Sequence, residues 1–278
     1  MSAVLQDDFV VIESLEKTFH PHGVFRGRRE SVAAVKDVTL SIPRNAIMGL
    51  VGESGSGKTT LARSLLYLDP PSKGRVSVAG VELGALSRKQ LRAFRSKMQI
   101  VFQDPNSALN PRLTVSGSIR EALTNHGVPR ERQRRRVAEL LELVGISPDR
   151  MNRHPHEFSG GQKQRICVAR ALAMEPAFLV LDEPVSNLDV SIQAQIINLL
   201  LRLHREFELT YLFISHDLNL IGYMSDLVAV MKDGELVEMG PAERILSRPE
   251  HPYTQRLFAS ATGFHDRTRP NAYFVKEE

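Results

Sequence analysis

Short apolar runs bounded by glycine, proline or polar residues dominate the first hundred residues of the chain. They fall at residues 10–12, 38–42, 46–51, 75–78 and 98–102 and are rich in β-branched side chains. Runs of this length and composition are typical of strands. The stretch from His20 to Ser31 is polar and glycine-rich, so we expect it to form an exposed loop.

The hydrophobic pattern changes at Asp104. Apolar residues recur at helical spacing over 115–123 and 132–144, which predicts an inserted helical segment reaching to about Met174. Strand-like runs return at 178–181, 211–214 and 227–231, and Asp233-Gly234 after the last run predicts a hairpin turn. A long amphipathic helix is predicted between the first two of these runs, with an apolar face formed by Ile196, Leu199, Leu200, Leu203 and Phe207.

Continuous apolar strands that alternate with helices predict an α/β fold with a parallel sheet covered on both faces. The 278 residues are enough for one large α/β unit or two small domains. With 42% hydrophobic and 24% charged residues, the composition is that of an ordinary globular protein.

The composition also limits the possible environments of the chain. No apolar run approaches the ~18–20 residues that cross a bilayer, and no N-terminal segment resembles a signal peptide. We therefore expect a cytosolic chain that can still dock on a membrane protein. Cys167 is the single cysteine, which excludes an internal disulfide and a cysteine metal cluster, and we expect a buried, inert thiol. The net charge of +4 suits a phosphate ligand or an anionic membrane surface, and it permits nucleic acid without requiring it.

A candidate phosphate-binding loop follows the run at 46–51. Its glycines allow backbone N–H groups to surround an anion, and the predicted helix after it adds partial positive charge. We expect Lys58 to contact the β- and γ-phosphates and the Thr59 hydroxyl to hold Mg²⁺. The flanking strand and helix argue against a chance match or a plain flexible turn. The predicted nucleotide contacts here are Gly52, Glu53, Ser54, Gly55, Ser56, Gly57, Lys58, Thr59 and Thr60.

Two acids end the predicted strand at 178–181. The carboxyl end of such a strand faces the crevice in which α/β proteins bind ligands. Asp182 is therefore a candidate Mg²⁺ ligand, directly or through water, and Glu183 a candidate base for an attacking water. The alternative is an Asp-Glu-Pro turn that merely ends the strand.

Ser159-Gly160-Gly161-Gln162 precedes a helix predicted from Lys163 to about Met174. Ser159 is a candidate N-cap, and the two glycines leave bare N–H groups at a helix N-terminus, which makes a second anion site. Taken alone, this stretch is equally compatible with an ordinary capped helix start.

Together these motifs resemble the ATP-binding cassette (ABC) ATPase family, over nearly the whole chain. In that family the Ser-Gly-Gly-Gln segment defines membership. The family's glutamine loop resembles Gln103, its dimer-interface loop resembles residues 186–189, and its switch histidine resembles His216. For a lone histidine or glutamine, a satisfied strand-end residue or a solvated loop residue would be the alternative. The resemblance also implies an aromatic residue stacked on adenine, for which Phe19 is the candidate and Phe25 the competitor.

The resemblance implies a single ABC ATPase domain. It would have a P-loop NTPase (RecA-like) core with a mixed sheet, an N-terminal antiparallel β-subdomain and an inserted α-helical subdomain. The core would comprise 1–103 and 174–245, the helical subdomain 104–173, and a family-specific tail 246–278.

The resemblance further implies a head-to-tail pair of subunits with two ATPs between them. Each ATP would contact Lys58 of one subunit and Ser159, Gly160 and Gly161 of the other, with Gln162 and Asp189 nearby. Gln103 would sense Mg²⁺ and the attacking water, and His216 would contact the γ-phosphate. The implied Mg²⁺ ligands are Thr59, Gln103 and Asp182.

Several stretches resemble the subfamily that powers bacterial uptake of oligopeptides, dipeptides and nickel: residues 101–105, 108–112, 156–162 and 251–254. This implies a second, paralogous or identical ATPase subunit, two permease subunits, an external binding protein acting indirectly, and a peripheral location on the cytoplasmic face of the inner membrane. The cargo would be peptides or nickel and other metal chelates. The alternative is a soluble ABC ATPase that acts on nucleic acid or ribosomes, although no nucleic acid is expected here, since such relatives carry long coiled-coil insertions or two cassettes. The basic run at 130–136 is interpreted as a solvated helix face.

Overall fold

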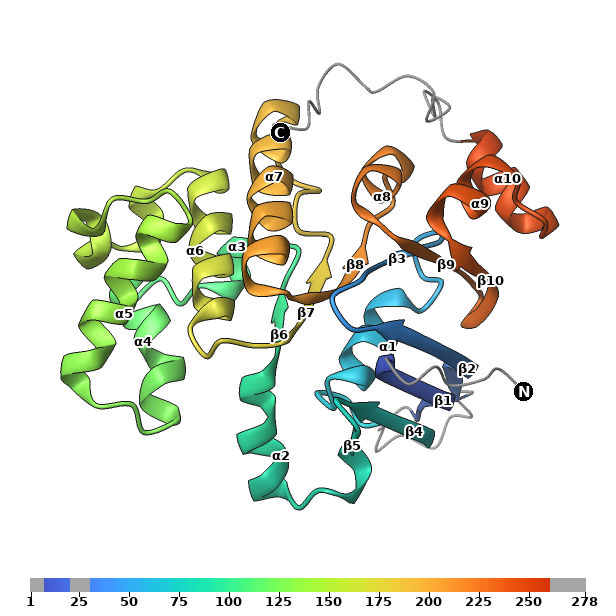
Figure 1. Cartoon of the computed structure of the whole chain (residues 1–278), viewed down its shortest axis with the longest axis horizontal. Coiled ribbons are helices and arrows are strands. Elements are labelled where there is room, and N and C mark those ends of the chain that lie inside the picture. The colour runs from blue at the N-terminus through green and yellow to red at the C-terminus, as the bar shows by residue number, and fades with distance from the viewer. Residues whose placement is uncertain (1–7, 21–30, 261–278) are drawn as a thin grey trace, which may run out of the picture. The chain divides into compact units, whose positions relative to one another are not determined.

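A computed structural model describes residues 8–20 and 31–260 of the chain (Figure 1). The chain divides into two compact units. The first comprises residues 1–91 and 212–270, and the second comprises residues 92–211 and 271–278. Each unit is described by itself below.

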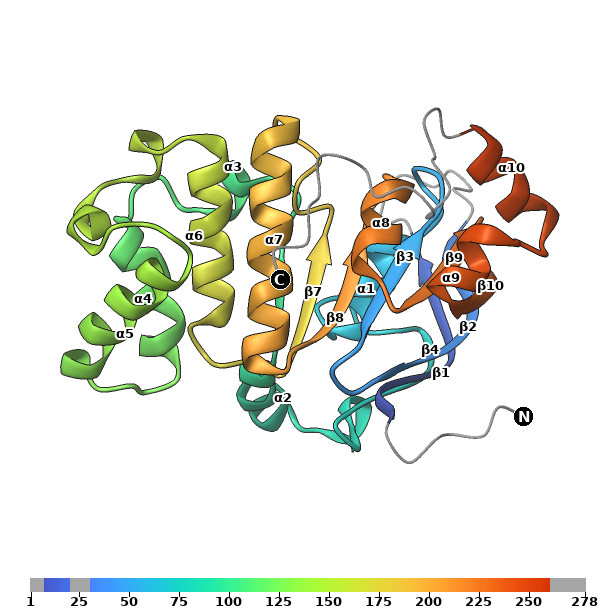
Figure 2. The ribbon, with the colours of Figure 1, turned by 45° about the horizontal axis from the view of Figure 1, so that its top comes forward.

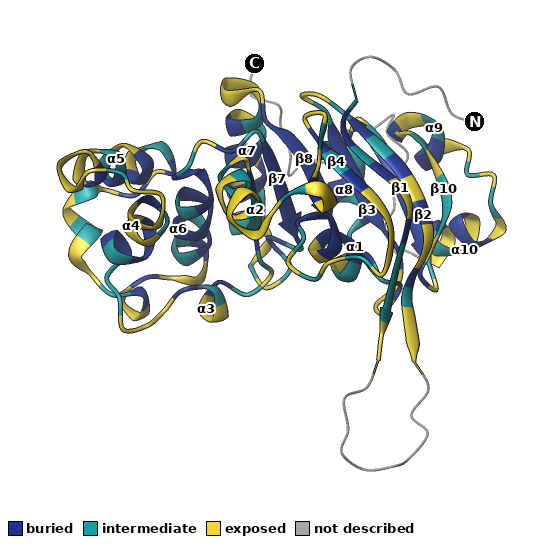
Figure 3. Ribbon diagram, turned by 90° about the horizontal axis from the view of Figure 1, so that it is seen from below, coloured by how far each residue is buried: buried dark blue, intermediate teal, exposed yellow. Residues whose placement is uncertain are grey.

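The first unit contains an antiparallel sheet in the order β2-β1-β4-β5. Its strands are β1 (Asp8–Phe19), β2 (Val32–Pro43), β4 (Lys73–Val78) and β5 (Val81–Glu82). Val10 lies opposite Ile42 on one side and Val78 on the other, and all three side chains are fully buried. β1 and β2 become exposed toward the ends that flank residues 21–30 (Figure 3). The predicted loop at 20–31 lies largely outside the described residues, and so does Phe25.

A second, mixed set of strands lies in the same unit. β3 (Ile47–Val51) is parallel to β9 (Leu227–Lys232), and β9 is antiparallel to β10 (Glu235–Pro241). Every residue of β3 is buried, as expected for a strand covered on both faces. Asp233 and Gly234 join β9 to β10 with φ values of 50° and 87°, so the predicted two-residue hairpin turn is confirmed.

The helices of the first unit follow these strands. They are α1 (Lys58–Leu65), α8 (Leu218–Met224), α9 (Ala242–Ser247) and α10 (Pro252–Ser260), with a 3₁₀ turn at Leu83–Ala85. The helix α2 (Arg88–Phe94) and the strand β8 (Thr210–Ile214) contain the points at which the chain passes from one unit to the other.

The second unit joins a parallel strand pair to a group of helices. β6 (Met98–Val101) runs parallel to β7 (Phe178–Asp182), with Val101 opposite Leu181. The predicted helical insert forms α3 (Pro105–Ala108), α4 (Val115–Asn125), α5 (Arg130–Leu143) and α6 (Gly160–Leu172). Figures 1 and 2 show α4, α5 and α6 side by side. 3₁₀ turns lie at Arg95–Lys97, Pro148–Asn152 and Pro155–Glu157.

The long amphipathic helix is α7 (Val190–Phe207), and four of the five residues predicted for its apolar face are buried. Phe207 is the exception: it is 45% exposed, because it is the last residue of the helix and extends past the packed stretch. The helix predicted to begin at Lys163 begins three residues earlier, at Gly160.

Two expectations from composition can be compared with the structure. Cys167 is 1% exposed, so the predicted burial of its thiol is confirmed, and burial raises the pKa of the thiol to about 11, which favours an unreactive group. Among the residues that the structure describes, no helix combines the length and apolar character that a membrane span requires.

Candidate functional site

The phosphate-binding loop lies between β3 and α1 in the first unit, where the sequence pattern predicts it. Two of its glycines are required by the backbone. Gly52 has φ of 151° and a Cβ there would lie 2.2 Å from the Met231 carbonyl oxygen, while Gly57 has φ of 101° and a Cβ there would lie 2.4 Å from the Ala34 oxygen. A side chain at either position would therefore push the loop away from β9 or β2.

Lys58 points back into this loop. Its Nζ donates to the carbonyl oxygens of Gly52 at 2.7 Å and Glu53 at 2.8 Å, and to Ser56 Oγ at 3.3 Å. The residue is 7% exposed, so its charge is kept in a low-dielectric site by acceptors from the loop itself. A buried, fixed cation inside a ring of backbone groups is suited to binding polyphosphate.

The loop is also held from outside, by residues of β2 and the β9–β10 hairpin. Gly234 N donates to the Ser56 carbonyl oxygen at 3.1 Å, and Lys36 N donates to the Gly234 oxygen at 2.8 Å. At the other side of the loop, the Tyr253 hydroxyl accepts a hydrogen bond from Glu53 N at 3.2 Å. In the sequence, residues 251–254 carry only the subfamily resemblance, and this contact was not predictable because nothing local connects positions 53 and 253.

In the second unit, the structure brings Gln103 and Glu183 together. Gln103 Nε2 donates to Glu183 Oε2 at 3.0 Å, although the residues are 80 positions apart. Glu183 follows β7 with φ of 47°, a left-handed conformation that is costly for a non-glycine residue. The surrounding structure must impose this conformation. The preceding Asp182 is 6% exposed, and its carboxylate ends the buried strand.

The Ser159 segment forms the start of α6 with a reciprocal cap. Ser159 Oγ accepts from Gln162 N at 3.4 Å, and Gln162 Oε1 accepts from Ser159 N at 3.2 Å, which confirms Ser159 as the N-cap. The two glycines differ. A Cβ on Gly161 would lie 2.4 Å from Ile192 Cγ2, whereas a Cβ on Gly160 would lie 3.3 Å from Leu188 Cδ2. Gly161 is therefore needed for the packing of α6 on α7, while Gly160 is exposed.

The remaining candidates lie near the ends of their elements. His216 follows β8 and is exposed, and Asp217 next to it caps α8 by accepting from Asn219 N at 2.8 Å. Asp189 is the exposed N-cap residue of α7. Phe19 ends β1 and is 43% exposed, with Lys17 Nζ 5.2 Å from the centre of its ring.

The candidate residues thus divide between the two units. The first unit carries the loop residues 52–60 with Phe19 and His216, and the second carries residues 159–162 with Gln103, Asp182, Glu183 and Asp189. In the first unit, the Thr59 hydroxyl is an oxygen donor of the kind that Mg²⁺ prefers, and the loop supplies backbone N–H groups and a fixed ammonium for phosphate. In the second unit, the Asp182 carboxylate is likewise an oxygen donor that suits Mg²⁺.

Comparisons with known proteins show the family of the chain. Residues 35–186 match the model of the "ABC transporter" family, and residues 237–277 match the "Oligopeptide/dipeptide transporter, C-terminal region". The chain is 48% identical to the oligopeptide transport ATP-binding protein OppF of Bacillus subtilis, over 89% of this chain and 82% of that protein. It is 44% identical to the dipeptide transport ATP-binding protein DppF of Lactococcus lactis, over 90% of this chain and 80% of that protein.

A solved structure supports the same fold. The ATP-binding cassette MJ0796, described as a dimeric post-hydrolysis state bound to ADP and Pi, aligns with a TM-score of 0.74 at 30% identity and covers 84% of this chain and 98% of that one. The expected P-loop NTPase fold with its N-terminal antiparallel sheet is therefore confirmed. The chain belongs to the ABC transporter ATPase family and carries that family's oligopeptide/dipeptide transporter C-terminal region.

Proposed function

We propose that the chain is the ATP-hydrolysing subunit of a bacterial importer for peptides. The observation that carries this proposal is the carboxylate of Glu183, which lies at the end of a buried strand in a left-handed backbone conformation and accepts a hydrogen bond from Gln103. A carboxylate oriented in this way can position an attacking water and accept its proton.

The other residues would bind and orient the triphosphate. Lys58 and backbone amides from the loop at 52–60 would hold the phosphate groups, and His216 would contact the γ-phosphate. Thr59 and Asp182, with Gln103, would hold Mg²⁺, which supplies charge neutralisation when bound. Phe19 would stack on adenine, because its ring is partly exposed at the end of β1.

ATP binding would drive transport by pairing two cassettes. Ser159, Gly160 and Gly161 of one subunit would contact an ATP held by Lys58 of the other, with Gln162 and Asp189 at the same interface. ATP then favours the closed pair, because only there does it gain contacts from both subunits. The dimeric state described for MJ0796 supports this arrangement.

The proposed cargo and partners are inferred from the transporters to which the similar proteins belong. OppF and DppF are named for oligopeptide and dipeptide transport, and the match over residues 237–277 supports the same cargo class here. We infer that a second ATPase subunit and two permease subunits assemble with the chain at the cytoplasmic face of the inner membrane, with an external binding protein delivering the peptide. We keep nickel and other metal chelates as a second cargo class only because the wider subfamily, which the sequence resembles, includes transporters of nickel.

The test compares Glu183→Gln with Glu121→Gln, which changes an exposed carboxylate on α4 in the same unit. Both variants should bind ATP with wild-type affinity. Glu183→Gln should lose at least about 100-fold in ATP turnover, the lower range for a general base, whereas Glu121→Gln should retain it. Turnover near the wild-type rate in Glu183→Gln would refute the assignment of Glu183.

A further inference from the structure

Tyr253 lies on α10, far from the phosphate-binding loop in sequence, and yet it contacts that loop. Its hydroxyl accepts the hydrogen bond from Glu53 N at 3.2 Å, and its side chain is buried, with 4% exposure. Both residues belong to the first unit. None of the roles proposed above uses this tyrosine.

The tyrosine ring lies beside a lysine at the end of β9. Lys232 Nζ, at the end of β9, lies 5.3 Å from the ring centre, within the range of a cation–π contact. Met231, the residue before it, supplies the carbonyl oxygen that excludes a side chain at Gly52. A tyrosine hydroxyl of ordinary pKa, about 10, is protonated at neutral pH, and burial raises the pKa of Tyr253 further, so the hydroxyl is a neutral acceptor for the Glu53 amide.

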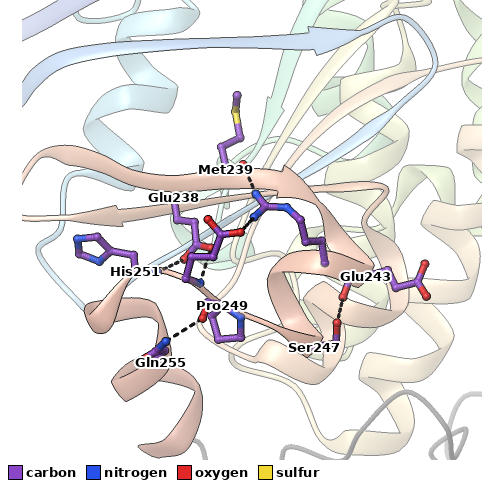
Figure 4. A network of polar contacts seen from close by, with 9 residues as sticks. Glu238, Met239, Glu243, Ser247, Pro249, His251 and Gln255 are labelled. Carbon is purple, nitrogen blue, oxygen red and sulfur yellow. Dashed lines mark hydrogen bonds and ion pairs between the residues drawn. The ribbon is translucent and has the colours of Figure 1, made fainter.

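The segment before Tyr253 is tied to β10 (Figure 4). Glu238 Oε1 accepts from Glu250 N at 2.9 Å and Glu238 Oε2 accepts from His251 N at 3.1 Å. Arg244 Nη1 donates to Glu250 Oε1 and Arg244 Nη2 donates to the Met239 carbonyl oxygen, both at 2.9 Å. These bonds fix the start of α10, and therefore the position from which Tyr253 reaches the loop.

We propose that Tyr253 is a positioning residue for ATP binding, through which the C-terminal region holds the phosphate-binding loop in its binding shape. The loop is then anchored at two points, by Tyr253 at Glu53 and by Gly234 at Ser56. Residues 53–55 between these anchors are exposed, and without the first anchor the Glu53 carbonyl oxygen is still held by Lys58 but its amide is not, so the free loop would be more mobile and its ordering on phosphate binding would cost affinity. This inference rests on the proposed ATPase function.

The experiment compares Tyr253→Phe with Tyr211→Phe. Tyr211 is a matched control, because its buried hydroxyl also bonds the backbone, donating to the Leu200 carbonyl oxygen at 3.1 Å, but in the second unit's helix–strand packing. Each substitution removes one hydroxyl and keeps the ring. The dissociation constant for ATP, measured directly by calorimetry, should rise about 3- to 10-fold in Tyr253→Phe, as expected for one hydrogen bond, with kcat within about 2-fold of wild type.

A second readout reports on the loop itself. Amide hydrogen exchange in the peptide containing Glu53 should be faster in Tyr253→Phe and unchanged in Tyr211→Phe. Glu238→Gln weakens the bonds that hold the start of α10 to β10 without contacting the loop, so it should also raise the dissociation constant for ATP. This variant tests the proposal if Tyr253→Phe does not fold. Unchanged ATP affinity, or an equal loss in Tyr211→Phe, overturns the proposal. Binding is measured without Mg²⁺, so that ATP is not hydrolysed during the titration, and failure of the ATPase assignment would be seen separately in kcat.

Discussion

Substitution by alanine should destabilise the protein at Gly161 but leave its stability almost unchanged at Gly160. At Gly161 the new Cβ would lie 2.4 Å from Ile192 Cγ2, whereas ordinary contacts are 3.4–4 Å, so the atoms must separate by about 1 Å or more. Ile192 Cγ2 is bonded to a branched Cβ with a stiff χ1, so it cannot move without shifting α7. Overpacking of this kind costs about 1–3 kcal/mol, which exceeds the gain of up to about 1 kcal/mol in helix propensity.

Gly160 provides the internal comparison. Its Cβ would lie 3.3 Å from Leu188 Cδ2, the far end of a flexible side chain that can yield. Gly160→Ala should therefore leave the free energy of unfolding within about 0.5 kcal/mol of wild type. Denaturant unfolding followed by circular dichroism measures both variants, and the slope of each transition checks that a two-state comparison is valid.

A double-mutant cycle identifies the cause. Ile192→Ala removes the atom that Gly161→Ala would meet, so the double variant should be more stable than the sum of the two single losses predicts, by about 1 kcal/mol or more. If Gly161→Ala is as stable as Gly160→Ala, or if the two losses simply add, then close packing between α6 and α7 is not the reason for this glycine.

Two further predictions concern titratable groups. Cys167, with a pKa raised to about 11 by burial, should not react with an aromatic disulfide reagent at pH 8 in the folded protein and should react fully after denaturation; rapid labelling of the native protein would contradict the buried assignment. Burial alone would raise the pKa of Glu238, but hydrogen bonds from the Glu250 and His251 amides and the charge of Arg244 outweigh this effect and lower the pKa below 4.5. The stability that the Glu238 carboxylate contributes is therefore present above pH 4.5 and is lost as the pH falls through its folded-state pKa. The melting temperature of Glu238→Gln should accordingly be below that of the wild type at pH 7, with a difference that shrinks below about pH 4.5; a constant difference would exclude this linkage.

Much of the fold was predictable because local chemistry specifies it. The strand at 46–51, the glycines of the loop and the start of a helix near Lys58 all act over a few residues, and the structure has them at β3, the loop and α1. Asp233-Gly234 likewise forms its hairpin turn, because both residues tolerate positive φ.

What could not be predicted arises from contacts between distant residues. The bond from Gln103 to Glu183 and the bond from Glu53 to Tyr253 join positions 80 and 200 residues apart, which no periodicity records. Phe207 matched the helical spacing but lies at the helix end, where the packed stretch is already complete. The left-handed backbone at Glu183 is imposed by its surroundings and has no signal in the residue type.

The central claim is that ATP is held between two cassettes. Its most direct test is the mass of Glu183→Gln by light scattering at saturating ATP and Mg²⁺. The variant is measured alone and mixed with the second ATPase subunit proposed above, and Lys58→Ala in the same background is the control. The account predicts an ATP-dependent rise from a single subunit of 31.1 kDa to about twice that mass in at least one of the two samples, and no rise in the control. A strictly monomeric mass in both samples with ATP bound would contradict it.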